Sequence, residues 1–110
     1  IKDKKIKNFI LRYQVLNDFP SRELRNIVDN GKNDIKEGIL IVFCTFENKV
    51  GVAVGVTKKL TNKFDAVQLV KEAAIILGGK GGGGRKDFAQ AGGQNQNKII
   101  QAFEEIKNLI

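Results

Sequence analysis

The residues best suited to chemistry lie in a glycine-rich stretch at positions 78–93, which holds eight of the chain's twelve glycines. Glycine permits backbone conformations with positive φ and lacks the Cβ that would hold a ligand away. Successive glycine amides can also form a concave nest that binds an anionic oxygen. Three cations, Lys80, Arg85 and Lys86, bracket the run. Together these features predict a phosphate-binding surface.

A flexible linker is the competing interpretation, because glycine-rich segments often behave as random coils. Two features favour an ordered loop: the run lacks Ser and Pro, and it continues directly into residues 87–91, which have the pattern of a short strand. The named nucleotide-binding motifs do not fit. A dinucleotide fingerprint must follow a strand and open a helix, whereas this run follows an expected helix. The P-loop pattern fails because Gly81 stands where Ser or Thr must follow the lysine.

The stretch resembles the C-terminal (C-Ala) domain of alanyl-tRNA synthetase, which is related to the DHHA1 domains of DHH-type phosphoesterases. The positions that match the family pattern are Lys80, Asp87, Ala89, Gln90, Ala91, Gly92 and Gly93. The resemblance extends over residues 9–110. Two departures concern the loop: there is one more glycine between Lys80 and Asp87 than is usual, and Lys86 stands where proline is common.

The resemblance implies a domain that contacts the outer corner (elbow) of tRNA, where the D and T loops meet, and helps aminoacylation and editing modules act on one tRNA. In the mechanism expected here, the cations neutralise phosphates, the glycine amides approach the RNA backbone, and an amide side chain bonds sugar or base. The expected nucleic-acid-binding residues are Lys80, Gly81, Gly82, Gly83, Gly84, Arg85, Lys86 and Gln90.

Composition supports a polyanion as the partner. The chain has 110 residues, enough for one domain, and its net charge of +7 favours association with nucleic acid.

Residues 1–8 form a basic leader, expected to be the end of an upstream linker or helix, or else an auxiliary phosphate-tracking patch. Residues 9–110 are expected to form a single domain. No apolar run approaches the ~20 residues needed to cross a bilayer, and because the chain begins at Ile1 we expect a fragment of a longer protein.

The chain lacks the usual catalytic groups. It contains no His, and its one cysteine, Cys44, lies in an apolar run, which predicts a buried structural thiol in a reducing, cytoplasmic setting. We therefore expect no enzymatic activity and no cofactor in this fragment. The resemblance implies that the ATP, magnesium and zinc sites of the parent synthetase lie elsewhere, and that the other partners are those parent domains. A second copy of the chain, in a homo-oligomer, is an alternative partner.

Periodicity indicates the elements that must position the glycine-rich stretch. Alternating apolar residues predict a strand over 9–16, and two β-branched runs at 39–46 and 49–56 predict a hairpin. Helices are expected after Ser21, over 64–77, and after Asn95-Gln96-Asn97, with Ser21 and the Asn95 segment as N-caps. The order predicts an α/β or α+β domain: a mixed sheet of four to five strands with about three helices on its faces.

Two other functions are compatible with this fold. The first is the substrate-binding half of a DHH-family phosphoesterase, in which the glycine-rich loop would hold a substrate phosphate. Such domains typically carry a His after the glycines, and this chain has none. The second is a structural or oligomerisation module, which sequence patterning does not test.

Overall fold

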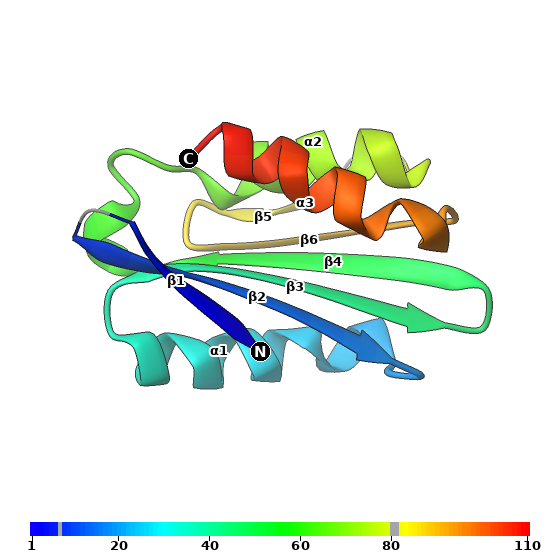
Figure 1. Cartoon of the computed structure of the whole chain (residues 1–110), viewed down its shortest axis with the longest axis horizontal. Helices are drawn as coiled ribbons and strands as arrows, with labels where there is room; N and C mark the ends of the chain where they lie inside the picture. Colours follow the sequence, from blue (N-terminus) through cyan, green and yellow to red (C-terminus); the bar gives the residue numbers. More distant parts are fainter. Residues whose placement is uncertain (7, 80–81) are drawn as a thin grey trace.

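The chain folds as one six-stranded sheet with helices on both faces (Figure 1), in a computed structural model that describes residues 1–6, 8–79 and 82–110. The strands run in the order β1-β2-β3-β4-β6-β5, and only β2 and β3 are parallel among the pairs. Their bounds are β1 Lys2–Ile6, β2 Phe9–Asn17, β3 Gly38–Phe46, β4 Lys49–Val56, β5 Gly83–Arg85 and β6 Phe88–Gly93.

Three α-helices cover the sheet in the described part of the chain. Helix α1 (Leu24–Ile35) lies on one face, and α2 (Ala66–Leu77) and α3 (Ile99–Asn108) lie together on the other (Figure 1). Short 3-10 turns, η1 (Ser21–Glu23), η2 (Lys58–Leu60) and η3 (Gln96–Lys98), precede them. None of these helices is long and apolar enough to cross a membrane. The mixed α+β class predicted from the sequence is confirmed.

The strand count was predicted too low, four to five where the sheet has six. One addition, β1, lies in the basic leader and pairs antiparallel with β2 from Lys2 opposite Tyr13 to Ile6 opposite Phe9. Most of β1 is exposed, and an edge strand rich in lysine carries almost no apolar alternation. The other addition, β5, lies inside the glycine run, where no side chains signal a strand. Lys7 of the leader lies outside the described residues.

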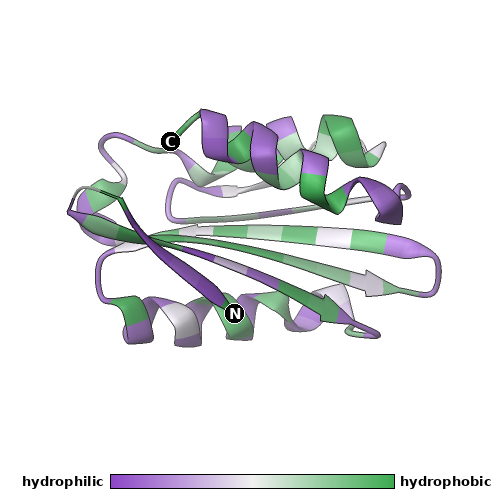
Figure 2. Cartoon of the chain, in the orientation of Figure 1, coloured by the Kyte–Doolittle hydropathy of each residue, from purple (hydrophilic) through white to green (hydrophobic). Residues whose placement is uncertain are grey.

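The predicted hairpin is confirmed as β3 and β4, joined at Glu47-Asn48. Both turn residues have positive φ, 48° and 64°, as a two-residue hairpin loop with the twist of its strands requires. Strand β3 is buried along most of its length, and Figure 2 shows the two strands as the most apolar part of the sheet. The valines of β4 point into the larger core under α2 and α3.

The opposite face of β4 carries small residues so that α1 can approach closely. A Cβ added at Gly55 would overlap Cγ1 of Val28, and one at Gly51 would lie 3.1 Å from Cβ of Ser21. The smaller core between α1 and the sheet includes Leu24, Val28 and Cys44. This close approach of α1 to the small residues of β4 positions the helix on the sheet.

The helix boundaries differ from the predicted caps. Helix α1 begins at Leu24, after η1, and Ser21 makes no capping bond with its side chain. Asn95 does not cap α3 either: its Nδ2 donates to the carbonyl of Ile76 at 3.3 Å, which ties the segment before η3 to α2. Helix α2 has the expected stop at Gly78, where φ is 77°, a conformation that favours glycine.

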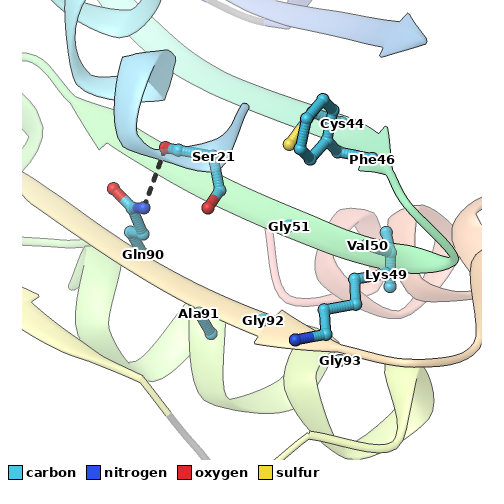
Figure 3. Close-up of a pocket in the computed structure, with 10 residues that line it drawn as sticks. All are labelled: Ser21, Cys44, Phe46, Lys49, Val50, Gly51, Gln90, Ala91, Gly92 and Gly93. Carbon is cyan, nitrogen blue, oxygen red and sulfur yellow. Dashed lines mark hydrogen bonds between the residues drawn. The ribbon is translucent and has the colours of Figure 1, made fainter. Parts of the chain in front are cut away.

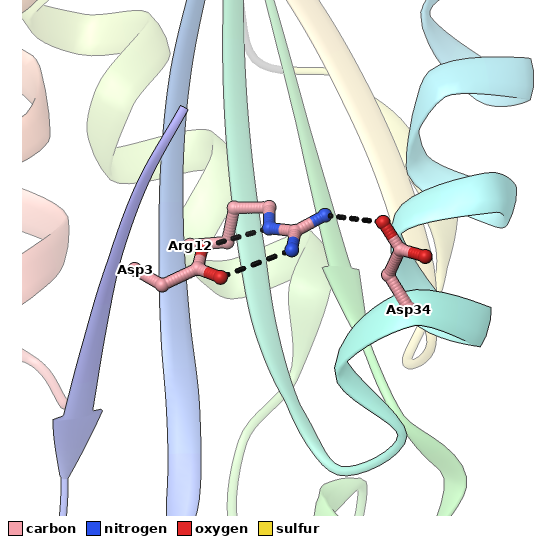
Figure 4. A network of polar contacts seen from close by, with 3 residues as sticks. All are labelled: Asp3, Arg12 and Asp34. Atoms are coloured by element: carbon pink, nitrogen blue, oxygen red, sulfur yellow. Dashed lines mark hydrogen bonds and ion pairs between the residues drawn. The ribbon is translucent and has the colours of Figure 1, made fainter.

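A partly buried arginine joins the β1 edge to α1 (Figure 4). The side chain of Arg12 on β2 is only 11% exposed, and its Nε and Nη2 donate to the two carboxylate oxygens of Asp3 at 2.7 and 3.0 Å. Its Nη1 donates to Asp34 on α1 at 3.2 Å. The leader predicted from the sequence is therefore connected to the sheet and to α1 by directional ion pairs.

Candidate nucleic-acid interface

Residues 83–93 of the glycine-rich stretch form a β-hairpin at one edge of the sheet. Strand β5 pairs antiparallel with β6, from Gly83 opposite Gln90 to Arg85 opposite Phe88, and residues 86–87 form the turn. Residues 83–93 therefore have the ordered pairing that the sequence favoured over a linker. Over 83–85, however, the chain is an extended strand where a concave amide nest was expected. The predicted site residues Lys80 and Gly81 lie outside the described residues.

Close packing inside the domain explains most of the described glycines in this stretch. A Cβ at Gly82 would overlap the carbonyl oxygen of Gln90, and one at Gly79 would overlap that of Gly92. Gly84 combines a φ of 151° with a similar clash against the carbonyl of Phe88. Gly83 differs, because a Cβ there would meet nothing within 4 Å. Gly83 is therefore the described glycine of β5 whose Cα faces open space, where a ligand backbone can approach.

The turn of this hairpin carries a cluster of cations. Arg85 and Lys86 are exposed, and with Lys58 and Thr61 of the η2 region they line a hollow of about 360 Å³. Asp87 also lines it and pairs with Nε of Arg85 at 3.3 Å, which offsets part of the positive charge. The remaining lysines leave the hollow suited to an anionic ligand.

Lys32 holds the turn from the face of the sheet that α1 covers (Figure 1). Its Nζ donates to the carbonyl oxygen of Asp87 at 2.7 Å. Burial lowers the pKa of Lys32 below its ordinary value, the carboxylates of Asp87 and Asp29 oppose that shift, and the charges of Arg85 and Arg25 add to it. Positive groups from α1, η2 and the β5–β6 hairpin thus converge here, and we call Lys32, Lys58, Arg85 and Lys86 the basic edge.

Two members of the basic edge, Lys32 and Lys58, were not among the predicted site residues. Lys32 and Asp87 are separated by 55 positions in the sequence, and only the packing of α1 against β3 and β4 brings them together. The sequence gave no signal of which cation of α1 reaches the turn.

Gln90, by contrast, lies away from the basic edge. It lines a second hollow of about 360 Å³ with Ser21, Cys44, Lys49 and Gly92 (Figure 3). Its Nε2 donates to the Ser21 carbonyl at 3.0 Å. Along β6, Gln90 is three residues from the turn at Asp87, about 10 Å at the usual rise of a strand, and its side chain bonds η1 and no member of the basic edge. The residues that match the family pattern therefore lie in two different hollows, Asp87 at the basic edge and Gln90 beside Ser21.

Two residues with alternative chemical roles have structural ones here. Phe88 is 8% exposed and packs in the smaller core, with the guanidinium carbon of Arg25 5.2 Å from its ring centre. Phe88 therefore packs in the core, and its ring is not open to stack on a base. Cys44 is buried, and burial raises the pKa of its thiol, which disfavours the nucleophilic thiolate. The described residues contain no group of three or more His, Cys, Asp or Glu able to hold a metal.

Comparison with known proteins gives a consistent result. A curated alanine–tRNA ligase of Hyphomonas neptunium is 50% identical over 86 residues, which is 78% of this chain and 10% of that protein. The enzyme of Fusobacterium nucleatum is 47% identical over 93 residues, 84% of this chain and 10% of its own length. The chain thus spans about a tenth of the length of the curated relatives it matches.

The fold matches a solved structure over nearly its whole length. The crystal structure of the C-Ala domain from Aquifex aeolicus alanyl-tRNA synthetase superposes with a TM-score of 0.90 and 30% identity, covering 99% of this chain and 97% of that one. The profile of the DHHA1 domain matches residues 8–110. The chain therefore belongs to the DHHA1 domain family.

Proposed function

We propose that this chain is the C-terminal RNA-binding domain of an alanyl-tRNA synthetase, and that it contacts the tRNA elbow through the basic edge. The observation that carries the proposal is the convergence of Lys32, Lys58, Arg85 and Lys86 around one turn of the family's matching motif. The net charge of +7 supports a polyanionic ligand. The likeness to the Aquifex C-Ala domain and to alanine–tRNA ligases supports tRNA as that ligand.

In this proposal the three outer cations of the basic edge neutralise phosphates, while Lys32 positions the turn. Folded RNA is recognised largely by shape and by contacts to phosphate and 2′-hydroxyl groups, which suits a rigid hairpin with exposed cations. Strand β5 is last in the described sheet, so one side of its backbone has no strand partner among the described residues. Next to Gly83 this free edge offers amide donors to the RNA backbone.

The domain contributes binding and no chemistry of its own in this proposal. The parent enzyme carries out alanylation and editing in other modules, with ATP, magnesium and zinc held there, and this domain helps both modules act on one tRNA. The parent protein works in the cytoplasm, and its other domains are the second partner of this chain.

The test is binding of the chain to tRNA over a series of salt concentrations. Each of Arg85→Gln and Lys86→Gln is expected to flatten the dependence of log K on log salt by roughly 0.7–0.9 of a slope unit, the value for one lost phosphate contact. Lys71→Gln, an exposed charge on α2, is the matched control and leaves the slope unchanged. A tRNA with a disrupted D-loop/T-loop corner should bind weakly. Equal binding of intact and disrupted tRNA would exclude the elbow as the target.

A further inference from the structure

The opposite edge of the sheet carries a second basic surface, which has aromatic rings. A hollow of about 190 Å³ lies between β1, β2 and α3, the elements at the front edge of Figure 1. Its lining residues are Lys2, Lys4, Leu11, Tyr13, Phe103 and Lys107, together with Asp3. We call this surface the aromatic hollow.

The register of the strands explains how the cations come to surround the rings. Lys2 pairs with Tyr13 and Lys4 with Leu11, and residues opposite each other on antiparallel strands project to the same face. On α3, Lys107 lies one turn after Phe103, which places both side chains on the same side of the helix. Three ammonium groups thus lie around one apolar floor.

The aromatic floor is rigid and partly open. The rings of Tyr13 and Phe103 stack with centres 4.1 Å apart and an angle of 27° between their planes. Tyr13 also contacts the buried Phe43 edge-on at 6.1 Å. Both stacked rings are only partly buried, so a flat ligand can pack against their exposed sides without reorganising the core.

The charges around this floor have no counter-ion in the described structure. The ion pairs found among residues 1–6, 8–79 and 82–110 involve none of Lys2, Lys4 and Lys107. Asp3 lines the hollow, but both of its carboxylate oxygens bind Arg12, so its charge is offset there. The hollow is therefore positively charged and has an aromatic floor.

We propose that the aromatic hollow binds an unpaired nucleotide of RNA, with the base against the Tyr13–Phe103 pair and the flanking phosphates on the three lysines. Aromatic platforms flanked by cations bind single-stranded nucleic acid in this way, because every base has a π-face and every nucleotide a phosphate. The inference rests on the proposed function, since it gives the chain a second RNA contact on the edge of the sheet opposite the basic edge.

The experiment uses the intrinsic fluorescence of Tyr13, the only tyrosine in a chain without tryptophan. A short single-stranded oligoadenylate RNA is expected to quench this emission, because a base packed against the phenol ring provides a local route for de-excitation. Inorganic polyphosphate is expected to compete through charge but to quench little. Equal quenching by both probes would overturn the role of the base.

Variants separate the aromatic contact from the charges. Phe103→Leu keeps an apolar side chain but removes the ring, and should weaken oligoadenylate binding about tenfold, as loss of one stacking contact does. Phe46→Leu, at an exposed phenylalanine that ends β3 and does not line the aromatic hollow, is the aromatic control. Lys4→Gln and Lys107→Gln should each flatten the salt slope, with Lys71→Gln as the charge control. No difference between these variants and their controls would overturn the proposal.

A parallel titration with tRNA separates this proposal from the proposed function. Binding of tRNA that depends on Arg85 and Lys86, while oligoadenylate leaves Tyr13 emission unchanged, overturns the aromatic hollow alone. Quenching by oligoadenylate that persists in Arg85→Gln supports the hollow as an independent contact. Circular dichroism of each variant checks that a loss of binding is not a loss of fold.

Discussion

Each outer edge of the sheet is fastened to α1 through a cation, but the two edges use different acceptors. At the β1 edge, Arg12 joins the carboxylates of Asp3 and Asp34. At the β5 edge, Lys32 donates to the neutral carbonyl of Asp87. An arginine held by two carboxylates is satisfied in charge, whereas a partly buried ammonium bound to a carbonyl keeps a net positive charge. The β5 edge therefore retains a charge that an anionic ligand can use.

The two edges also differ in the structural reason for their unusual amino-acid composition. The glycines of the β5 edge reflect the close approach of backbones within the domain, at Gly79, Gly82 and Gly84. The lysines of the β1 edge reflect solvent exposure of a strand that needs only its backbone for pairing. The glycines of one edge and the lysines of the other are both candidate ligand-binding groups, and both also have a structural role. Substitutions can separate the two roles.

The largest effect is expected from Gly82→Val at the β5 edge. A Cβ at this position overlaps the carbonyl of Gln90 and lies 2.6 Å from Cβ of Ala91, so valine must push β5 away from β6. We expect the free energy of unfolding to fall by about 3 kcal/mol, the upper part of the range for overpacking. Urea denaturation followed by circular dichroism measures this loss.

Gly83→Val is the matched control one residue away. A Cβ there meets nothing within 4 Å, so its effect on the free energy of unfolding should stay within about 0.5 kcal/mol. Its effect should instead fall on RNA affinity, because the added side chain fills the open side of β5. If both variants lose stability equally, the glycines are needed for backbone freedom along the whole strand, and close packing does not explain them.

At the β1 edge, Arg12→Met should lower the free energy of unfolding by about 1–2 kcal/mol, as loss of charge-assisted hydrogen bonds does. Methionine keeps the apolar stem of the side chain and removes the bonds to Asp3 and Asp34. Arg22→Met, at an exposed arginine of η1, is the control and should change stability by less than about 0.5 kcal/mol. An Arg12→Met chain as stable as the control would mean that β1 is held by backbone pairing alone.

Sequence reasoning predicted those parts of the fold in which side chains carry the pattern. The alternation in β2, the β-branched hairpin β3–β4 and the apolar faces of α2 and α3 depend on local periodicity. It missed β1 and β5, because lysine and glycine strands have no apolar alternation. The basic edge could be predicted only through Arg85 and Lys86, since the position of Lys32 depends on tertiary packing.

The ion pair at the β1 edge gives an expected dependence on acid. Hydrogen bonding to Arg12 lowers the pKa of Asp3 below its ordinary value, burial opposes the shift, and the Arg12 charge adds to it. A carboxylate with a lowered pKa stabilises the folded state above its unfolded pKa, and this stability is lost as pH falls through the folded pKa. Asp3→Asn should thus lose stability near neutral pH, by less than about 1 kcal/mol because the pair is partly exposed.

Denaturation of the Asp3→Asn chain and its parent at several pH values measures this difference. The gap between the two proteins should close as the pH falls below about 4, the ordinary range of an aspartate. Asp18→Asn, at an aspartate in the turn after β2, is the control. A gap that stays constant across this range would show that Asp3 acts through packing or hydrogen bonding that does not need its charge.

The smallest effect is expected at Lys32, and its sign is opposite to that at Asp3. Because burial lowers the pKa of Lys32, folding disfavours its charged form, and this unfavourable contribution disappears as pH rises from the folded pKa towards the unfolded value. The parent chain should therefore gain stability relative to Lys32→Met as the pH rises towards 10.5, the ordinary pKa of a lysine. The gain should be only a few tenths of a kcal/mol, since solvent screens a half-buried ammonium. A gap that narrows or stays constant would mean that the hydrogen bond to Asp87 outweighs desolvation, and that the β5 edge is held by charge as firmly as the β1 edge.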